Sequence, residues 1–229
     1  MREILKYIIS TILLFLTISL SAQKNDPFKK RQVFVRAGID LMRFSLPFTS
    51  DYNINAFELS IDTEVKYRFF PTFEYGFEKI NNNTETQNYS LNGNYFRIGF
   101  NYNMVNYKHR LDRNIFFIGA SYGFSSFLHK ADRITISNQW GDINIAYPET
   151  SLSANWLEGV IGVRAELITN FYMGFTIRIK TMLKHTNYTH VVPYRVPGFG
   201  EGTKNIAYGL SYSVFYAIPL KNNDFDFQK

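Results

Sequence analysis

The sequence of 229 residues contains no cysteine, so neither a disulfide nor a thiolate metal site can form. Beyond residue 22 it also lacks any apolar run that approaches the roughly 18 residues of a membrane-spanning helix. Apolar residues at helical spacing are scarce. Aromatic residues are abundant instead, with 22 Phe and 16 Tyr, and this composition is typical of β-strands. Packing and backbone hydrogen bonds must therefore hold the fold, and the sequence favours an all-β protein.

The first 22 residues have a composition different from the rest. Arg2 and Lys6 precede an apolar run over residues 8–20, and small residues follow at Ser21 and Ala22. A positive start, an apolar core and small residues at a cleavage point are typical of a secretory signal peptide. The alternative, an anchor helix, needs about 20 apolar residues. We therefore expect a signal peptide at 1–22 and one domain at 23–229.

The domain alternates apolar and polar residues with a period of two. This pattern predicts eight strands, at about 33–43, 55–65, 70–80, 91–104, 114–128, 152–168, 171–183 and 204–218. One face of these strands carries bulky uncharged residues throughout. The opposite face carries glycine, serine and a predicted lumen charge network: Arg36, Asp40, Glu58, Asp62, Glu74, Arg97, Glu158, Arg164, Glu166, Arg178 and Lys180.

A soluble barrel would turn the apolar face inward, whereas a membrane barrel turns it toward lipid. Eight strands enclose room for little more than ordinary side chains, so the bulky rows would overfill the interior. Glycines on a solvated outer face would weaken the strands without purpose. The pattern thus predicts an eight-stranded antiparallel up-and-down transmembrane β-barrel.

Connection lengths support this topology. The connections at 44–54, 81–90, 129–151 and 184–203 are expected to be long, those at 66–69 and 169–170 tight, and the one at 105–113 intermediate. Outer-membrane barrels have long external loops and short periplasmic turns. We expect an aromatic girdle at the lipid boundary, formed by Phe44, Phe69, Tyr95, Trp156, Phe171 and Tyr172. The last strand carries a signal expected to be read by the barrel-assembly machinery: Gly209, Tyr212, Val214 and Tyr216.

Several segments carry a family resemblance. Leu152 to Glu158 reads Leu-Ser-Ala-Asn-Trp-Leu-Glu, and 97–104, 118–127, 196–199 and 209–212 add to the pattern. Together these segments resemble a domain-of-unknown-function family of small Gram-negative outer-membrane β-barrels. The resemblance implies an architecture and a location in the outer membrane. It implies no activity and no functional residues.

Three functions stay open at this point. The first is a structural or interaction role, with a side-chain-filled lumen and surface loops that bind an envelope protein. The second is a lipid-modifying enzyme that uses the loop histidines His129, His185 and His190; their spacing is not a zinc pattern and no Gly-x-Ser-x-Gly turn accompanies them. The third is a narrow pore for small polar solutes. We favour the first, without catalytic residues, cofactor, metal or nucleic acid, and with outer-membrane lipid and lipopolysaccharide as surroundings.

Overall fold

The computed structural model describes residues 30–49, 53–66, 68–84, 87–106, 113–139, 141–186 and 192–226. The expected signal peptide at 1–22 and the candidate His190 lie outside the described residues. In the described part, no helix is long and apolar enough to cross a membrane.

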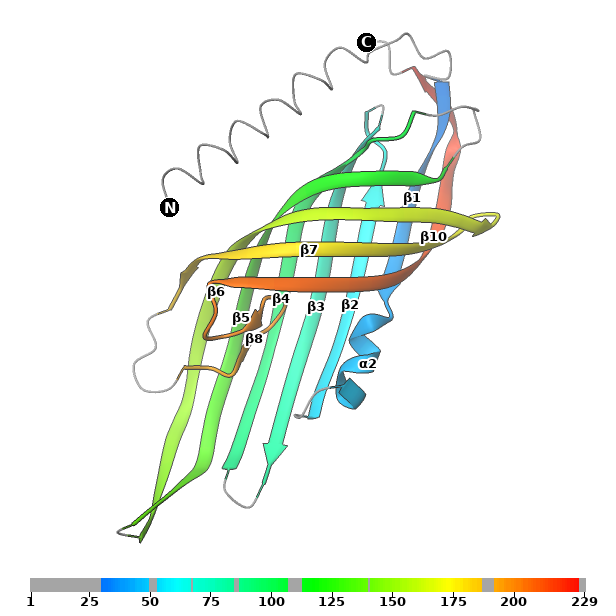
Figure 1. The fold of residues 1–229 in the computed structure, drawn as a ribbon. Helices are drawn as coiled ribbons and strands as arrows, with labels where there is room; N and C mark the ends of the chain where they lie inside the picture. The colour runs from blue at the N-terminus through cyan, green and yellow to red at the C-terminus, as the bar shows by residue number, and fades with distance from the viewer. Residues whose placement is uncertain are drawn as a thin grey trace.

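The main body is a closed antiparallel barrel of eight strands in the order β1-β10-β7-β6-β5-β4-β3-β2 (Figure 1). Each strand pairs with its neighbours along the chain, and pairing of β1 with β10 closes the ring. The all-β, eight-stranded, antiparallel architecture predicted from the alternation is confirmed. The strands are β1 Lys30–Asp40, β2 Asn53–Thr63, β3 Phe69–Asn83, β4 Gln87–Asn103, β5 Ile115–Asn138, β6 Gly141–Ile168, β7 Phe171–His185 and β10 Ile206–Asp226.

The two ends of the barrel differ. We call one the α2 end, because it carries the helix α2 (Met42–Thr49) and the small hairpin of β8 (Arg195–Val196) and β9 (Gly200–Glu201). The other, the turn end, has the connection between β2 and β3, that between β4 and β5, and the tight turn at 169–170. Figure 1 shows α2 beside β2, and the segment with β8 near the start of β10.

Two of the predicted long loops are wrong. At 81–90, β3 and β4 continue as a paired hairpin to Asn83 and Asn88. At 129–151, β5 and β6 run on to Asn138 and Gly141, which makes these strands 24 and 28 residues long. Residues 81–84 are polar, so the apolar alternation ends there although the hydrogen-bonded ladder continues. In the extension of β5 and β6, Ile134 lies opposite Ile145, so one face keeps apolar residues among the polar ones. The predicted loop at 44–54 includes most of α2, and the one at 184–203 includes the β8–β9 hairpin.

The predicted orientation of the two strand faces agrees with the side-chain exposure. The uncharged rows point outward; Ile98, for example, is 58% exposed and Ile179 is 52% exposed. We call this exposed set the apolar belt: Ile39, Leu59, Ile61, Phe73, Tyr75, Phe96, Ile98, Phe100, Phe116, Ile118, Leu157, Ile161, Val163, Phe175, Ile177, Ile179, Tyr208, Leu210 and Tyr216.

The interior is layered, with charged residues between two apolar regions. At the α2 end, a large cluster packs strand residues such as Tyr95 and Trp156 against Val196 and Phe199 of the β8–β9 hairpin. At the turn end, smaller aromatic clusters form around Phe70 with Phe117, and around Phe34 with Tyr172 and Phe215. The barrel therefore has an apolar layer at each end of its charged centre.

The predicted aromatic girdle needs correction at three positions. Tyr95, Trp156 and Tyr172 point into the barrel and are almost completely buried, so they cannot contact a lipid boundary. Inward glycines leave room for such rings: a Cβ added at Gly76 would lie 2.4 Å from the Tyr95 ring, and one at Gly123 would lie 2.2 Å from Trp156. The other three girdle residues, Phe44, Phe69 and Phe171, are at least partly exposed.

Candidate functional site: the charged interior and the cavity at the α2 end

At the turn end of the charged layer, two arginines share one carboxylate. Arg36 donates through Nε to Oδ1 of Asp62 at 2.6 Å, and Arg164 pairs with the other oxygen of Asp62. The guanidinium of Arg36 lies 4.8 Å from the centre of the Phe70 ring, and that of Arg164 lies 4.1 Å from the centre of Phe215. Ring faces attract cations, so the aromatic clusters and Asp62 together hold two buried positive charges.

The centre of the layer is a network of two arginines and three glutamates. Arg97 pairs with Glu58, with Glu74 at 2.6 Å and with Glu158 at 3.6 Å. Arg178 pairs with Glu74 at 2.8 Å and with Glu158 at 3.0 Å. Buried charges persist only when they are paired and hydrogen-bonded, and every carboxylate here has at least two such partners. This geometry makes the centre a structural lattice.

The network is fastened to neighbouring aromatic groups. Tyr95 donates its hydroxyl to Glu58 at 2.5 Å, and Trp156 donates Nε1–H to Glu158 at 2.7 Å. Both rings belong to the apolar cluster at the α2 end. The inward direction of these two aromatic side chains therefore has a chemical reason, because their polar atoms satisfy buried carboxylates.

At the α2 end, Glu78 of β3 joins two segments that the sequence predicted as loops. Arg43 of α2 donates through Nη1 to one oxygen of Glu78 at 3.1 Å, and Arg195 of β8 donates through Nε to the other at 3.0 Å. Arg43 also contacts Glu58 at 2.9 Å. We call Arg43, Glu78 and Arg195 the rim clamp. It ties the helix and the small hairpin to the strand wall.

The predicted lumen charges all turn inward, although their surroundings differ. Asp40 accepts from the backbone N–H of Met42 at 3.0 Å, at the start of α2, and from that of Tyr212 at 3.1 Å. Lys180 donates to the backbone oxygens of Gly198 at 2.6 Å and Phe199 at 3.2 Å. These two residues therefore position chain segments, whereas the residues of the central network pair with one another.

One predicted lumen charge lies at the turn end, outside the central network. Glu166 pairs there with Arg113 at 3.3 Å.

Sequence reasoning missed three of the arginines that complete the pairs. Arg113 and Arg195 fall in predicted connections, where period two gives no direction for a side chain. Arg43 ends the strand predicted at 33–43, on its apolar face, but β1 stops at Asp40 and Arg43 belongs to α2. An uneven charge count was a usable signal, because the predicted lumen set contains more acidic than basic residues. Buried carboxylates require partners, so nearby connections had to supply some of them.

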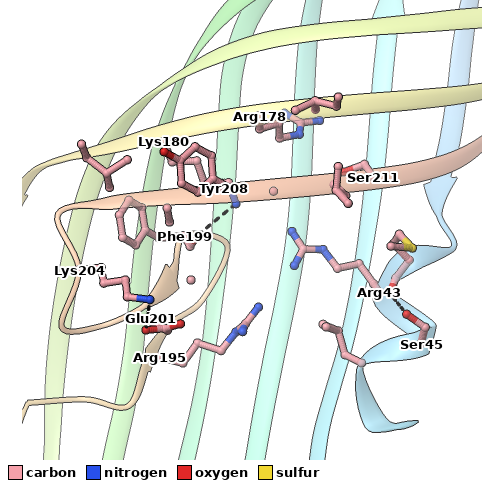
Figure 2. Close-up of a pocket in the computed structure, with 18 residues that line it drawn as sticks. Arg43, Ser45, Arg178, Lys180, Arg195, Phe199, Glu201, Lys204, Tyr208 and Ser211 are labelled. Atoms are coloured by element: carbon pink, nitrogen blue, oxygen red, sulfur yellow. Dashed lines mark hydrogen bonds and ion pairs between the residues drawn. The ribbon is translucent and has the colours of Figure 1, made fainter. Parts of the chain in front are cut away.

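A cavity of about 780 Å³ lies between α2 and the β8–β9 segment, beside the start of β10 (Figure 2). Its charged lining consists of Arg43, Arg178, Lys180, Arg195, Lys204 and Glu201. In Figure 2, Arg43 and Arg195 extend from opposite sides toward the same space. A much smaller void of about 20 Å³ lies in the charged layer, lined by Glu58, Glu74 and Arg164 among others.

The two candidate histidines in the described part of the chain, His129 and His185, lie in different strands. His129 of β5 is buried, and its ring meets Tyr89 edge-on at 6.2 Å between ring centres. His185 ends β7, with its Nδ1 3.0 Å from the backbone oxygen of Thr186. Within the described residues, no group of three or more His, Cys, Asp or Glu could hold a metal ion.

The last-strand residues lie on β10 as expected. Tyr212 and Tyr216 point outward, and Gly209 faces Arg178 across the ladder to β7.

Comparison with known protein families finds one family model that matches nearly the whole chain. The model of a domain of unknown function, DUF6048, matches residues 4–223. The chain belongs to the DUF6048 family. This match agrees with the resemblance to a family without assigned activity. The DUF6048 chain is also similar to a solved structure, described as a major outer membrane protein from Thermus thermophilus. The two share 10% identity over 82% of this chain and 98% of that chain, with a TM-score of 0.43. A comparison with curated proteins finds no match.

Proposed function

We propose that this DUF6048 protein is an outer-membrane anchor of a Gram-negative cell, with a closed lumen and a raised wall that presents a binding surface outside the membrane. The apolar belt around a charged interior carries this proposal. An N-terminal signal peptide at 1–22 would export the chain, and the barrel-assembly machinery would insert it. No chemistry is assigned to the barrel.

The belt favours a hydrocarbon environment. Soluble monomers rarely expose contiguous apolar patches larger than a few hundred Å², yet exposed apolar residues here occur on all eight barrel strands. In lipid, a closed barrel satisfies its backbone hydrogen bonds within the wall and leaves apolar side chains outside. The same sequence in water would bury its charges and expose its hydrocarbons, which is the costly arrangement.

The interior favours an anchor over a pore. The ion pairs of Arg97 and Arg178 cross the centre, and the void in the charged layer has a volume of only about 20 Å³. Such a void holds about one water molecule. Apolar clusters pack on the turn-end side of it, and the large cluster with the β8–β9 hairpin packs on the α2 side, beside the cavity. A steady flow of solutes would require many buried ion pairs to break together.

The strand lengths favour an exposed contact surface. A tilted strand needs about 9–11 residues to cross a membrane, whereas β5 has 24 and β6 has 28. Their paired extension, from Ala131 opposite Tyr147 to Asn138 opposite Gly141, forms a ribbon, which we call the raised edge. Figure 1 shows β5 and β6 reaching well beyond α2 and β2, with β3 and β4 extended beside them. An envelope protein partner is the occupant that we infer for this edge.

Refolding of residues 23–229 tests the membrane proposal. We expect folding into lipid vesicles or detergent, shown by a heat-dependent shift of the band in gel electrophoresis, and aggregation in plain buffer. A folded monomer in buffer without detergent would contradict the proposal. Planar-bilayer recordings then test closure, because a stable ohmic open state would exclude the closed lumen.

A shortened hairpin tests the role of the raised edge. A variant that replaces residues 132–146 with Asn-Gly keeps the barrel and removes the ribbon. We expect the intact protein, solubilised in mild detergent, to retain a stoichiometric companion that the shortened variant loses. Equal recovery with both proteins, or no companion with either, would refute the interaction role.

A further inference from the structure

The barrel wall is incomplete beside the start of β10. Pairing of β1 with β10 reaches only Asp40 opposite Ser213, because the chain then turns into α2. Residues 206–212 of β10 pair with β7 on one side, but no strand pairs with 206–211 on the other side in the described chain. The first residues of β2, from Asn53 to Glu58, likewise pair with β3 and not with β1. A gap in the hydrogen-bonded wall therefore separates β2 from β10.

The cavity at the α2 end passes around this unpaired edge. Its lining includes Ala207 and Ser211, which face the barrel interior, and Tyr208 and Leu210, which face outward. Neighbouring residues of a strand point to opposite sides of the sheet. A single cavity that touches both sets must connect the interior with the outer surface at the strand edge. The helix α2 contacts both β2 and β10 and lines this opening through Met42 and Leu46.

The inner side of the opening is cationic. Arg43, Arg178, Lys180, Arg195 and Lys204 line the cavity, and Glu201 is the single acidic residue among its described lining residues. The glutamates that pair with these arginines are absent from that lining, so they lie behind the cations as seen from the cavity. A molecule in the cavity therefore meets nitrogen donors first.

Two of these cations keep donor capacity. Arg195 donates through Nε to Glu78, and its two terminal nitrogens have no hydrogen-bond partner among the described residues. Lys204 forms its ion pair with Glu201 at 2.8 Å, and both side chains are more than half exposed. An exposed ion pair of this kind is weak, so a bound anion could replace Glu201 as the partner of Lys204 with little loss of free energy.

The outer side of the opening is apolar. Tyr208 is 78% exposed, and Ile206 and Leu210 are about half exposed on the same face. Tyr208 and Leu210 begin the part of the apolar belt that β10 contributes, and Ile206 precedes them at the α2 end of that strand. In a membrane barrel this is the boundary between hydrocarbon and headgroups. The opening thus pairs a hydrocarbon-facing exterior with a cationic interior at headgroup depth.

We propose that this lateral opening, between α2 and the unpaired edge of β10, binds an amphiphile with a phosphate headgroup of net negative charge, which enters the cavity while the acyl chains stay on the outer surface. The proposal rests on the membrane-embedded barrel inferred above. A phosphate accepts several charge-assisted hydrogen bonds from arginine and lysine. A free anion would make no contact with the apolar side chains of Ile206, Tyr208 and Leu210, whereas an uncharged lipid would form no ion pair with the cations.

Three soluble probes separate these chemistries. The barrel, folded in an uncharged detergent, is titrated with dihexanoyl phosphatidic acid, with dihexanoyl phosphatidylcholine and with glycerol 3-phosphate, and binding is measured by calorimetry. We expect phosphatidic acid to bind at least about tenfold more tightly than either of the others, which is the effect of one charge-assisted hydrogen bond or more. Equal binding of phosphatidylcholine would overturn the role of the cations. Equal binding of glycerol 3-phosphate would overturn the role of the acyl chains.

Charge-removing variants locate the site. Arg195→Gln and Lys204→Gln should each weaken binding of phosphatidic acid several-fold, whereas Lys130→Gln, on an exposed ion pair with Asp132 away from the cavity, should not. Lys204 is the safer test of the two, because its exposed side chain leaves the fold intact. Equal weakening by Lys130→Gln, or no effect of Lys204→Gln, would refute the site. Failure of the unmodified protein to fold in detergent would instead refute the membrane barrel, so the two failures are distinguishable.

Discussion

Glu78 and Arg195, which are 117 residues apart in the chain, form a 3.0 Å ion pair at the α2 end of the barrel. The second oxygen of Glu78 accepts from Arg43 at 3.1 Å. A fully buried strand carboxylate therefore holds two segments that cross the barrel mouth from opposite sides. This rim clamp explains how a helix and a hairpin without strand partners in the wall stay in place.

Glu78→Gln should loosen both segments at once. The amide loses the charge that strengthens its bonds to Arg43 and Arg195, and it keeps only one acceptor oxygen. Hydrogen exchange of the folded barrel in detergent should become faster in residues 42–49 and 195–201, while the β3–β4 ladder stays protected. Glu201→Gln is the control, because it removes only an exposed ion pair with Lys204. Unchanged exchange in α2 would mean that the clamp does not hold the helix.

Asp62→Asn should destabilise the barrel strongly. Asp62 pairs with Arg36 and Arg164, and all three side chains are buried. Without its charge two buried guanidinium groups face each other, and removal of one partner from a buried pair typically costs about 3–5 kcal/mol. Urea unfolding of vesicle-inserted protein measures the loss. Asp132→Asn, which removes an exposed partner of Lys130, should change the unfolding midpoint little. Similar losses in both variants would count against the shared-carboxylate arrangement.

Gly123→Ala should be more harmful than Gly159→Ala. A Cβ at Gly123 would lie 2.2 Å from the Trp156 ring, whereas one at Gly159 would meet nothing within 4 Å. Overpacking of this kind typically costs about 1–3 kcal/mol, and the displaced indole would also lose its bond to Glu158. Thermal unfolding in detergent, followed by near-ultraviolet circular dichroism, compares the two. Equal melting temperatures would show that Trp156 does not fill the interior beside Gly123.

Truncations should separate closure of the barrel from its stability. Deletion of 204–229 removes β10, so β1 and β7 lose their common partner and we expect no insertion into membranes. Deletion of 222–229 leaves the ladder from Phe34 opposite Pro219 to Asp40 opposite Ser213, and removes only the pairs of residues 224–226 with Lys30, Arg31 and Gln32. This shorter deletion should insert with reduced stability, which membrane fractionation and heat-dependent gel mobility measure. Insertion of the longer deletion would contradict the closing role of β10.

The faces of the strands were predictable because period two is a local property. Successive side chains of a strand point to opposite sides. Arg97 and Ile98 therefore point to opposite faces of the sheet, whatever the rest of the chain does. The same rule could have corrected the girdle. Tyr95 shares its face with Arg97, and Trp156 shares its face with Glu158, so both rings belong inside. An argument from composition near strand ends overrode the alternation, and it was wrong at these positions.

The strand ends were not predictable in the same way. Asn81, Asn82 and Asn83 continue β3 opposite Ser90, Tyr89 and Asn88, although this segment has no apolar face. Hydrogen bonding to a neighbouring strand extends the ladder there. A polar stretch of chain carries the same composition whether it is a loop or the paired edge of a sheet.

The sequence by itself determined which side chains point inward and which point outward, because alternation is imposed by the geometry of each strand and needs no distant partner. Only the tertiary structure decided what fills the barrel mouth. The positions of Arg43 and Arg195 depend on Glu58 and Glu78, carboxylates supplied by other strands and, for Arg195, 117 residues away in the chain. Such pairing is set by closure of the whole ring. For the same reason the gap beside β10 appears only once β1 ends at Asp40 and the chain turns into α2.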